Sequence, residues 1–282
     1  MPEQASLEKI KSLYDDRAPT YDSEKTGCHA EQAQDYIRWM TLEPGQNVLD
    51  LACGTGPITI PAKQAVGSSG TVIGIDISGV SLSLAREKAE KLNLDIKFLE
   101  HDISNLDGIE GMKEGFFDVI MCAAAFSLLE DPGAAVKNWA KLLKKSGKLI
   151  LDVPTDDSMI QRNLLSRVAK ELDSPIAHDQ TRLDTAEKIN KLLEDAGLDT
   201  GESFVTKNYM EVKPLDPEKA RDMYDSLTKN YSVFKIWFPV LDNLEKTAAA
   251  KEIFSKEMKK LAGPDGKVHQ QLKFYMAVGK NL

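Results

Sequence analysis

The stretch VLDLACGTGPITI, from Val48 to Ile60, holds an apolar run, an acid, small residues at Ala-x-Gly-x-Gly spacing and a second apolar run. This order predicts a buried strand at Val48–Leu51, then a tight loop and a helix. We expect the helix to start near Pro57, because proline suits a first helical turn, and to run to about Val66. The stretch therefore predicts the strand–loop–helix unit that many proteins use to hold a nucleotide.

The loop of this unit is built from small residues, Ala52, Gly54 and Gly56. Small residues let the backbone approach a ligand closely and adopt unusual dihedral angles. Free N–H groups at the start of the helix favour an anion, either a pyrophosphate or a carboxylate. The spacing differs from the G-x-G-x-x-G of dinucleotide enzymes. A plain tight turn without a ligand is the alternative interpretation.

Strands and helices alternate after this unit. We expect further strands at 72–75, 95–104, 116–126 and 147–154, with helices at 78–92 and 134–145. Short apolar strands that alternate with helices predict a doubly wound α/β fold, with a parallel sheet covered on both faces. In such sheets the ligand crevice lies at the carboxyl ends of the strands. Asp50, Asp76, Asp102 and the segment Cys122–Ala124 all fall at those ends.

The two ends of the chain follow a different pattern. Helices are expected at about 7–14, 30–40, 158–172 and 185–198, and late strands at 203–215 and 269–281. The late strands are expected to pair as antiparallel neighbours at one sheet edge. The helical stretches between them, from Asp216 to Leu261, would form a lobe over the crevice. Its aromatic segment FKIWFPVL, residues 234–241, either lines a pocket or forms the core of that lobe.

Two of the strand-end acids suit a nucleoside. Asp76 ends the second strand, where a carboxylate accepts hydrogen bonds from ribose hydroxyl groups. Its other possible role, as the cap of the next helix, can be filled by Ser78. Asp102 follows the third strand, where it suits an adenine amino group or is an ordinary turn residue. Three acids at successive strand ends, around one small-residue loop, favour the nucleoside.

Composition excludes several classes of protein. The chain has 282 residues, 28% of them charged, with a net charge of −8, which disfavours nucleic acid and anionic membranes as partners. Its three cysteines form no C-x-x-C pair, so a disulfide framework or a zinc site is not expected. Cys53 and Cys122 are interpreted as small packing residues rather than nucleophiles. We see no apolar segment of a secretory signal or membrane span, so a cytoplasmic location is expected.

From Leu13 to Pro154 the sequence resembles the class I S-adenosylmethionine-dependent methyltransferases. VLDLACGTGPITI is similar to the first motif of that family, VIGIDIS to the second, FLEHDIS to the third and FDVIMCAAAFSLLEDP to the fourth. YDDRAPTYD resembles the start of the branch that contains ubiquinone/menaquinone C-methyltransferases. The resemblance implies a Rossmann-like, mostly parallel sheet of seven strands with an antiparallel last strand and a helical lid.

The resemblance also implies roles for particular residues. Asp50 would orient the loop and the methionine amino group, Asp76 would bind ribose, and Asp102 with Ile103 would hold adenine. Tyr21 would lie near the methionine end of the cofactor. The full set expected around the cofactor is Tyr21, Asp50, Ala52, Gly54, Thr55, Gly56, Asp76, Ile77, Asp102, Ile103, Cys122 and Ala123.

The reaction implied is methyl transfer to a small organic acceptor by in-line displacement, without a metal and with S-adenosylhomocysteine as product. His29 and Phe126 are expected near the acceptor, although Phe126 is equally interpreted as a core aromatic. None of the histidines, His29, His101, His178 and His269, is assigned as a catalytic base, and His101 is expected to point away from the site. The acceptor atom (oxygen, nitrogen, sulfur or carbon) and the oligomeric state stay open.

Residues 1–154 are expected to form the N-terminal helices and the cofactor-binding core. Residues 155–282 would supply the late strands and an inserted substrate lid at about 214–262. Two alternatives of other classes are an NAD-dependent oxidoreductase and a non-catalytic protein that keeps the cofactor fold. The missing third glycine and the extra acid Asp102 count against the oxidoreductase.

Overall fold

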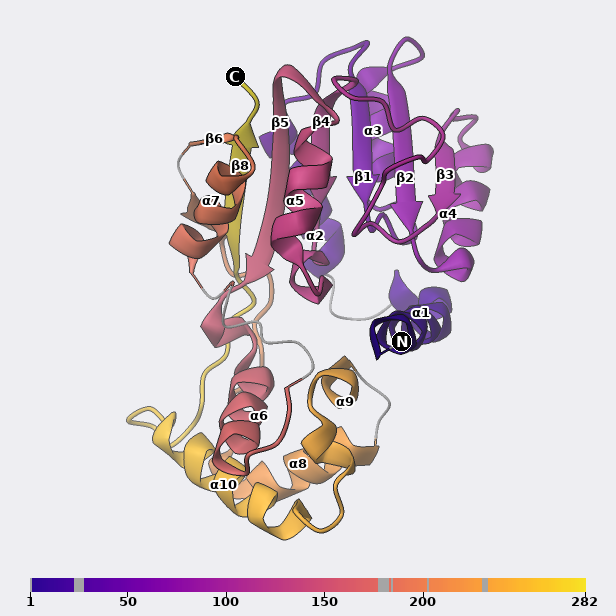
Figure 1. The fold of residues 1–282 in the computed structure, drawn as a ribbon. Coiled ribbons are helices and arrows are strands. Elements are labelled where there is room, and N and C mark those ends of the chain that lie inside the picture. Colours follow the sequence, from indigo (N-terminus) through magenta and orange to yellow (C-terminus); the bar gives the residue numbers. More distant parts are fainter. Residues whose placement is uncertain (1, 23–27, 177–182, 184, 202, 230–232) are drawn as a thin grey trace.

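The centre of the molecule is a mixed sheet. The computed structural model describes residues 2–22, 28–176, 183, 185–201, 203–229 and 233–282. Five strands are parallel neighbours in the order β3 (Lys97–Glu100), β2 (Thr71–Asp76), β1 (Asn47–Leu51), β4 (Phe117–Cys122) and β5 (Leu143–Pro154). The expected parallel core is confirmed, and Figure 1 shows all of its carboxyl ends at one edge of the sheet.

The last strand, β8 (Phe274–Lys280), runs antiparallel to β5 along its whole length. Two short strands, β6 (Asp199–Thr200) and β7 (Phe204–Val205), pair with opposite ends of β8. Because β5 occupies one side of β8, both short strands lie on the other side. β6 and β7 therefore share one place in the sheet, next to β8, so the sheet is seven strands wide. The expected seven-stranded arrangement with an antiparallel last strand is confirmed.

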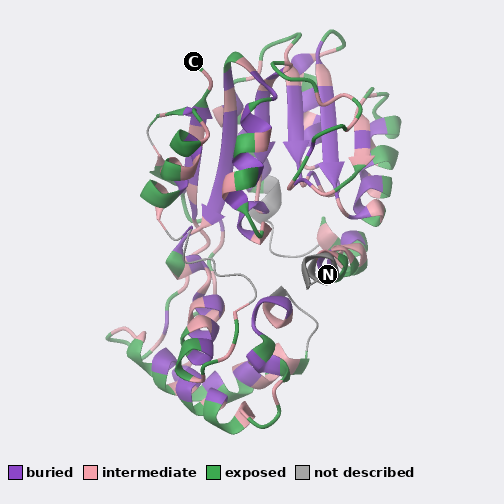
Figure 2. Ribbon diagram, in the orientation of Figure 1, coloured by how far each residue is buried: buried purple, intermediate pink, exposed green. Residues whose placement is uncertain are grey.

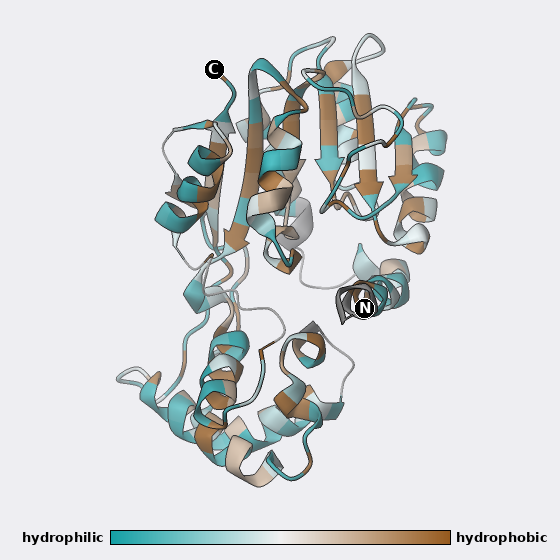
Figure 3. Cartoon of the chain, in the orientation of Figure 1, coloured by the Kyte–Doolittle hydropathy of each residue, from teal (hydrophilic) through white to brown (hydrophobic). Residues whose placement is uncertain are grey.

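Alternating side chains of the central strands face two helical layers. On one face Val48 and Val72 pack with α2 (Cys28–Met40) and α3 (Thr59–Val66), and α4 (Gly79–Lys91) extends this layer over Phe98. On the other face Leu49 and Ile73 pack with α5 (Pro132–Ala140) and α7 (Ala186–Asp195). The central strands are buried and hydrophobic along most of their length (Figures 2 and 3). The expected doubly wound fold is therefore confirmed.

A helical lobe lies beyond the carboxyl ends of the strands (Figure 1). It consists of α6 (Ile160–Glu171), α8 (Ala220–Lys229), α9 (Val233–Trp237) and α10 (Thr247–Lys260). The described residues also form short 3-10 helices, which include η1 (Phe126–Leu128), η2 (Asp156–Ser158), η4 (Pro217–Lys219) and η5 (Pro239–Asp242). Trp237 and Phe238 are buried in the core of this lobe, as the packing interpretation of residues 234–241 predicts. Helix α1 (Pro2–Tyr21) adds Ile10 and Leu13 to the same cluster and also packs on α4.

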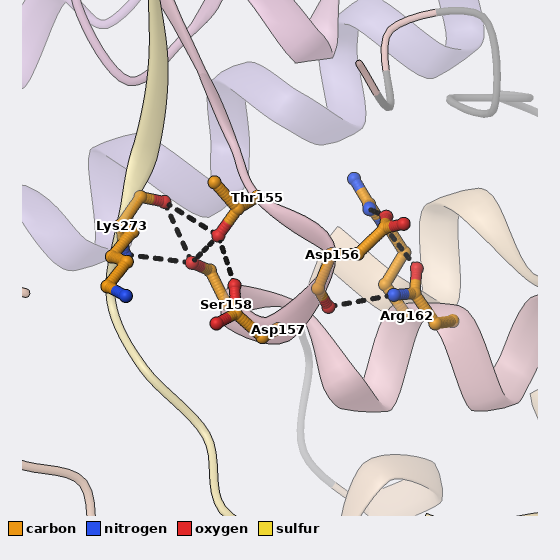
Figure 4. A network of polar contacts seen from close by, with 7 residues as sticks. Thr155, Asp156, Asp157, Ser158, Arg162 and Lys273 are labelled. Atoms are coloured by element: carbon orange, nitrogen blue, oxygen red, sulfur yellow. Dashed lines mark hydrogen bonds and ion pairs between the residues drawn. The ribbon is translucent and has the colours of Figure 1, made fainter. Parts of the chain in front are cut away.

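A polar cluster fastens the lobe to the sheet where β5 ends (Figure 4). The Ser158 hydroxyl donates to the Lys273 carbonyl at 2.7 Å and accepts from the Lys273 N–H at 2.8 Å. The Thr155 N–H donates to the same carbonyl at 3.0 Å. Arg162, at the start of α6, pairs with Asp156 at 3.5 Å. The contacts of Ser158 and Thr155 satisfy the backbone groups of Lys273 where the chain leaves β5 and where it enters β8.

Several element boundaries differ from expectation: among the strands, β3 ends at Glu100 rather than 104, and β8 starts at Phe274 rather than 269. Helix α3 starts at Thr59 rather than near Pro57, because Pro61 has no N–H to bond the Pro57 carbonyl and thus separates the helix from the preceding turn, in which the Ile60 N–H bonds to the Gly56 carbonyl. Helix α5 ends at Ala140 rather than 145, since burial of Leu143 against Phe117 draws the chain into β5. The N-terminal helix is longer than 7–14.

The expected strand 203–215 is reduced to β7 and two isolated bridges, Glu211 with Gln271 and Leu215 with Val268. The side chain of Asn208 accepts the Leu272 N–H at 2.8 Å, a position that a strand partner would otherwise fill. No described helix is long and apolar enough to cross a bilayer.

Candidate functional site

The loop after β1 has an unusual backbone. Ala52, Gly54 and Gly56 have φ angles of 58°, 53° and 84°, in the left-handed region. Alanine adopts this region at some energetic cost, whereas glycine does so freely. A Cβ added at Gly54 would meet nothing within 4 Å, so this side of the loop faces open space. The loop leaves room for a ligand against its backbone, as the small residues predict.

Asp76 holds the loop in place. Its carboxylate accepts hydrogen bonds from the Gly54 N–H at 2.7 Å and from the Ser78 N–H at 2.8 Å. Ser78 in turn caps α4 by accepting the Ser81 N–H at 3.0 Å, as predicted. Burial raises the pKa of Asp76, and the two backbone hydrogen bonds oppose that shift. The carboxylate also borders the pocket, so it contacts the loop and faces any ligand there.

Asp50 lies deeper, at the end of β1, and is 2% exposed. The Thr59 hydroxyl donates a hydrogen bond to its carboxylate at 2.6 Å. Burial raises the pKa of Asp50 to about 7; the Thr59 hydrogen bond opposes the shift, and the charge of Asp76 adds to it. A cationic ligand group would stabilise the ionised form of this buried acid.

Two adjoining pockets open at this edge of the sheet. The larger encloses about 820 Å³, counting its part open to solvent, which is enough for a nucleoside-sized ligand. Tyr21, Ala52, Gly54, Ala123 and Ala124 border both pockets. The predicted residues in the wall of the larger one are Tyr21, Ala52, Gly54, Thr55, Asp76, Ile77, Asp102, Ile103 and Ala123. The smaller one reaches Asp50.

Asp102 and His101 border the larger pocket together. The Asp102 carboxylate accepts the N–H and the hydroxyl of Ser104, at 2.9 and 2.6 Å. His101, expected to point away, is instead part of the pocket wall, with its Nδ1 2.8 Å from the Asp102 carbonyl oxygen. The reason is that β3 ends at Glu100, so the chain turns along the pocket at His101.

Several expected residues lie elsewhere. Phe126 is fully buried and packs on Trp139 at a ring-centroid distance of 6.0 Å, which agrees with the core interpretation; Ala125 and Leu128 border the pocket instead. Gly56 and Cys122 do not line either pocket. Burial raises the pKa of the Cys53 and Cys122 thiols well above the usual value, so both stay protonated, as packing residues do.

Two of the four histidines named in the sequence analysis lie partly or wholly outside the described residues. The side chain of His29 and the whole of His178 fall outside the described residues, although the backbone of His29 belongs to α2. His269 pairs with Asp265 at 2.8 Å, away from both pockets. Within the described ranges, no group of three or more His, Cys, Asp or Glu residues could hold a metal ion.

The structure adds a wall that the sequence interpretation missed. Leu7, Ile10 and Tyr14 of α1 border the larger pocket. Their helical spacing was visible in the sequence, but nothing local indicated which surface they would face. Thr55 accounts for part of the placement, because its hydroxyl donates to Asp22, directly after α1, at 2.6 Å.

Polar contacts fix α1 against α4 and the loop. The Ser78 hydroxyl donates to Asp15 at 2.6 Å, and Lys88 donates to the Thr55 carbonyl at 2.9 Å. Lys88 also pairs with Asp22, and Lys11 pairs with Glu100. These last pairs are about a third to a half exposed, so the ion pairs themselves contribute little to stability. The helix thus covers the pocket through packing and hydrogen bonds.

A second missed feature is the buried acid Asp152 in β5, which sits among apolar neighbours in GKLILDVP. It accepts hydrogen bonds from Gln32 at 2.8 Å, Tyr36 at 2.7 Å and the Ala124 N–H at 3.0 Å. Gln32 and Ala124 border the smaller pocket. An acid inside an apolar strand is the one signal in the sequence that could have indicated it.

The doubly wound sheet belongs to the Rossmann-like class, and the small-residue loop with acids at three successive strand ends is typical of proteins of that class that bind nucleosides. A family model described as "Methyltransferase domain" matches residues 42–197. This match covers more than half of the chain, so the protein belongs to that methyltransferase domain family.

Relatives agree with this assignment. A demethylmenaquinone methyltransferase from Bacillus cereus is 28% identical over 155 residues, which are 55% of this chain and 62% of the relative. A 2-phytyl-1,4-naphtoquinone methyltransferase from Nostoc sp. is 28% identical over 151 residues, 51% of this chain and 64% of the relative. The similarity therefore spans less than two thirds of each of these relatives.

A solved structure shares the fold. The SAM-dependent methyltransferase from Aquifex aeolicus superposes with a TM-score of 0.52 at 19% sequence identity, over 67% of this chain and 90% of that one. At this level of identity the likeness concerns the fold alone. It agrees with the sheet order and the doubly wound arrangement described above.

Proposed function

We propose that the protein is an S-adenosylmethionine-dependent methyltransferase that acts on a small organic acceptor. One observation carries the proposal: two adjoining pockets share the loop at Ala52 and Gly54, and each has a buried acid of its own, Asp76 or Asp50. A ligand with a nucleoside at one end and a charged amino-acid group at the other matches this pair of pockets.

The described residues fit such a cofactor. Ile77, Ile103 and Leu128 supply apolar surface for a base, and Asp76 can accept hydrogen bonds from ribose hydroxyl groups. Asp50, which borders the smaller pocket, suits an ammonium group. An NAD-dependent oxidoreductase would need space for a pyrophosphate and a second nucleoside, which this division into a larger and a smaller pocket does not favour.

The chain would act mainly by binding and alignment. When bound, the cofactor supplies an electrophilic methyl group on a sulfonium centre. Displacement there requires an in-line acceptor and exclusion of water rather than a protein nucleophile. The buried Asp50 and the aromatic ring of Tyr21 give the smaller pocket a negative environment that suits a cation. Tyr21 would lie beside the methyl group, because it borders both pockets.

For the acceptor we propose a quinone-like molecule, or another small metabolite with a nucleophilic O, N, S or C atom. The names of the two relatives, which refer to menaquinone and naphthoquinone compounds, support the quinone-like choice. We further propose that residues 214–262 serve as a lid, that no metal is required, and that the protein works in the cytoplasm on a small molecule rather than nucleic acid or a membrane.

The test is a pair of measurements on the purified chain. Calorimetry should show S-adenosylmethionine binding with a dissociation constant on the order of micromolar, and NADH should not bind. Incubation with a demethylated quinol should then release S-adenosylhomocysteine. No binding at millimolar cofactor would refute the methyltransferase assignment. Binding without turnover on any quinol or metabolite extract would favour the non-catalytic alternative.

A further inference from the structure

Asp152 is 1% exposed, yet it is placed where three elements of the site meet. Its Oδ2 accepts hydrogen bonds from the Gln32 amide at 2.8 Å and from the Tyr36 hydroxyl at 2.7 Å, both on α2. Its Oδ1 accepts the N–H of Ala124, in the loop after β4, at 3.0 Å. A buried carboxylate with three donors is satisfied, and it ties these elements to β5.

Two of the three donors belong to the wall of the smaller pocket, which also holds Asp50. Ala124 has a φ of 55°, so its backbone lies in the left-handed region that alanine rarely adopts. The hydrogen bond from its N–H to Asp152 stabilises that conformation. Gln32 is 2% exposed, so its amide has little freedom to choose another partner.

The contact with Asp152 decides which way the Gln32 amide faces. In the ionised form, in which both oxygens accept as they do in the structure, Asp152 requires Gln32 to turn its NH2 group toward it. The carbonyl oxygen at the other end of the amide is then the acceptor that Gln32 offers to the pocket. Together with the Asp50 carboxylate, it gives this pocket two acceptors and suits a ligand that carries an ammonium group.

We propose that Asp152 is a positioning residue for ligand binding: it orients the Gln32 amide and the Ala124 backbone so that the smaller pocket accepts hydrogen bonds from the ammonium group of an amino-acid moiety. This inference rests on the proposed function, which supplies a cofactor with such a moiety. Asp152 acts only through Gln32 and Ala124.

The substitution Asp152→Asn replaces one acceptor oxygen by an NH2 donor without changing the size of the side chain. It therefore tests whether Asp152 must act as a hydrogen-bond acceptor. The Ala124 N–H can only donate, so the remaining carbonyl oxygen of asparagine must stay opposite it. The new NH2 group then faces Gln32 and Tyr36. The Tyr36 hydroxyl can rotate to accept, but Gln32 must flip its amide to do so. The flip turns an NH2 group toward the pocket, where it opposes an ammonium group.

The experiment compares two ligands by calorimetry. S-adenosylhomocysteine contains the amino-acid moiety, whereas 5′-methylthioadenosine has the same nucleoside and thioether without it. In Asp152→Asn the affinity for S-adenosylhomocysteine should fall by tenfold or more, roughly the effect of losing a hydrogen bond to a charged group. The affinity for 5′-methylthioadenosine should change less than about threefold, because that ligand leaves the smaller pocket unused.

Gln32→Met repeats the test without altering the buried acid, and it should show the same selective loss. Asp118→Asn is the matched control: Asp118 accepts the Asn47 N–H at 2.7 Å and a hydrogen bond from Lys144 at 2.8 Å, outside both pockets. It should bind both ligands as the unmodified protein does.

The outcomes separate this proposal from the methyltransferase assignment. If the unmodified protein binds neither ligand, both are overturned. If it binds both ligands, and the two site variants lose affinity for both equally or for neither, the positioning role of Asp152 is wrong while the assignment stands. An Asp152→Asn variant that fails to fold leaves the decision to Gln32→Met.

Discussion

The backbone N–H of Gly54 donates a hydrogen bond of 2.7 Å to the carboxylate of Asp76, so the acid at the end of β2 holds the loop at the end of β1. Both residues border the larger pocket. One carboxylate thereby shapes the loop and faces the position proposed for ribose. Disturbing it should affect ligand affinity and loop stability together.

Asp76→Ala should lower the affinity for S-adenosylmethionine by about 30-fold or more, since it removes a charged acceptor for ribose hydroxyl groups. It also leaves the Gly54 and Ser78 N–H groups without their partner, which should lower the free energy of unfolding by about 1–3 kcal/mol. Calorimetry and urea denaturation measure the two effects.

The matched control for that variant is Asp131→Ala. Asp131 accepts the Ala134 N–H at 2.9 Å as the cap of α5, outside the pocket walls. It should lose about 1 kcal/mol of stability and keep its ligand affinity. Unchanged affinity in Asp76→Ala would refute the ribose role.

Ligand affinity should depend on pH through Asp50, whose pKa burial raises to about 7. A cationic ligand favours the ionised form, so binding should expel a proton below neutral pH. Affinity for S-adenosylmethionine should therefore rise about tenfold from pH 5.5 to pH 7. Calorimetry in two buffers of different ionisation enthalpy measures the released proton. Asp50→Asn should flatten the pH dependence of the affinity. An affinity of the unmodified protein that does not change with pH would contradict the role of Asp50.

Stability should depend on pH through Asp152. Burial raises its pKa from 3.8 to about 7, while the hydrogen bonds from Tyr36, Ala124 and Gln32 oppose the shift. Between these values the folded state binds more protons than the unfolded state, so the free energy of unfolding falls as pH rises. From pH 4 to pH 8 the free energy of unfolding of the unmodified protein should fall by on the order of 4 kcal/mol relative to that of Asp152→Asn. Urea denaturation at each pH checks the sign of this change.

Thr55→Val should weaken the hold of α1 on the loop. It removes the hydrogen bond from the Thr55 hydroxyl to Asp22, at the end of the helix that covers the pocket. We expect S-adenosylmethionine to dissociate about fivefold faster in stopped-flow fluorescence, in proportion to a hydrogen bond of about 1 kcal/mol. Thr55→Ser keeps the hydroxyl and should behave as the unmodified protein; equal rates in both variants would mean that this contact does not restrain the helix.

Gly74→Ala should destabilise the fold, because a Cβ there would lie 2.9 Å from the Cys53 sulfur and 3.0 Å from Phe98. Such overpacking costs about 1–3 kcal/mol, which thermal unfolding would detect as a lower Tm. Gly201→Ala is the matched control, since its Cβ would meet nothing within 4 Å. Equal Tm values for the two variants would show that the sheet yields at Gly74 without cost.

Sequence patterns and the family resemblance predicted the parallel core of the sheet and half of the wall of the larger pocket, but not all boundaries. Apolar runs that end in Asp50 and Asp76 are local features, so the strands and their acids could be read directly. The end of α5 could not, because Leu143 joins the sheet through burial against Phe117, a contact between distant segments. The position of Phe126 could not be predicted either, because its contact with Trp139 depends on how the loop after β4 packs.

By itself the sequence determined the class of fold and the placement of acids at the strand ends. The periodicity of apolar residues and the turn residues that indicate them are local features, each spanning a few positions. Only the tertiary structure decided that α1 supplies a wall of the larger pocket, and that Asp152 lies against Gln32 and Ala124 of the smaller one. These relationships join residues about 30 to 120 positions apart, as in the contacts of Asp152 with Ala124 and Gln32. Packing of the helices on the sheet fixes them, and no local pattern encodes that packing.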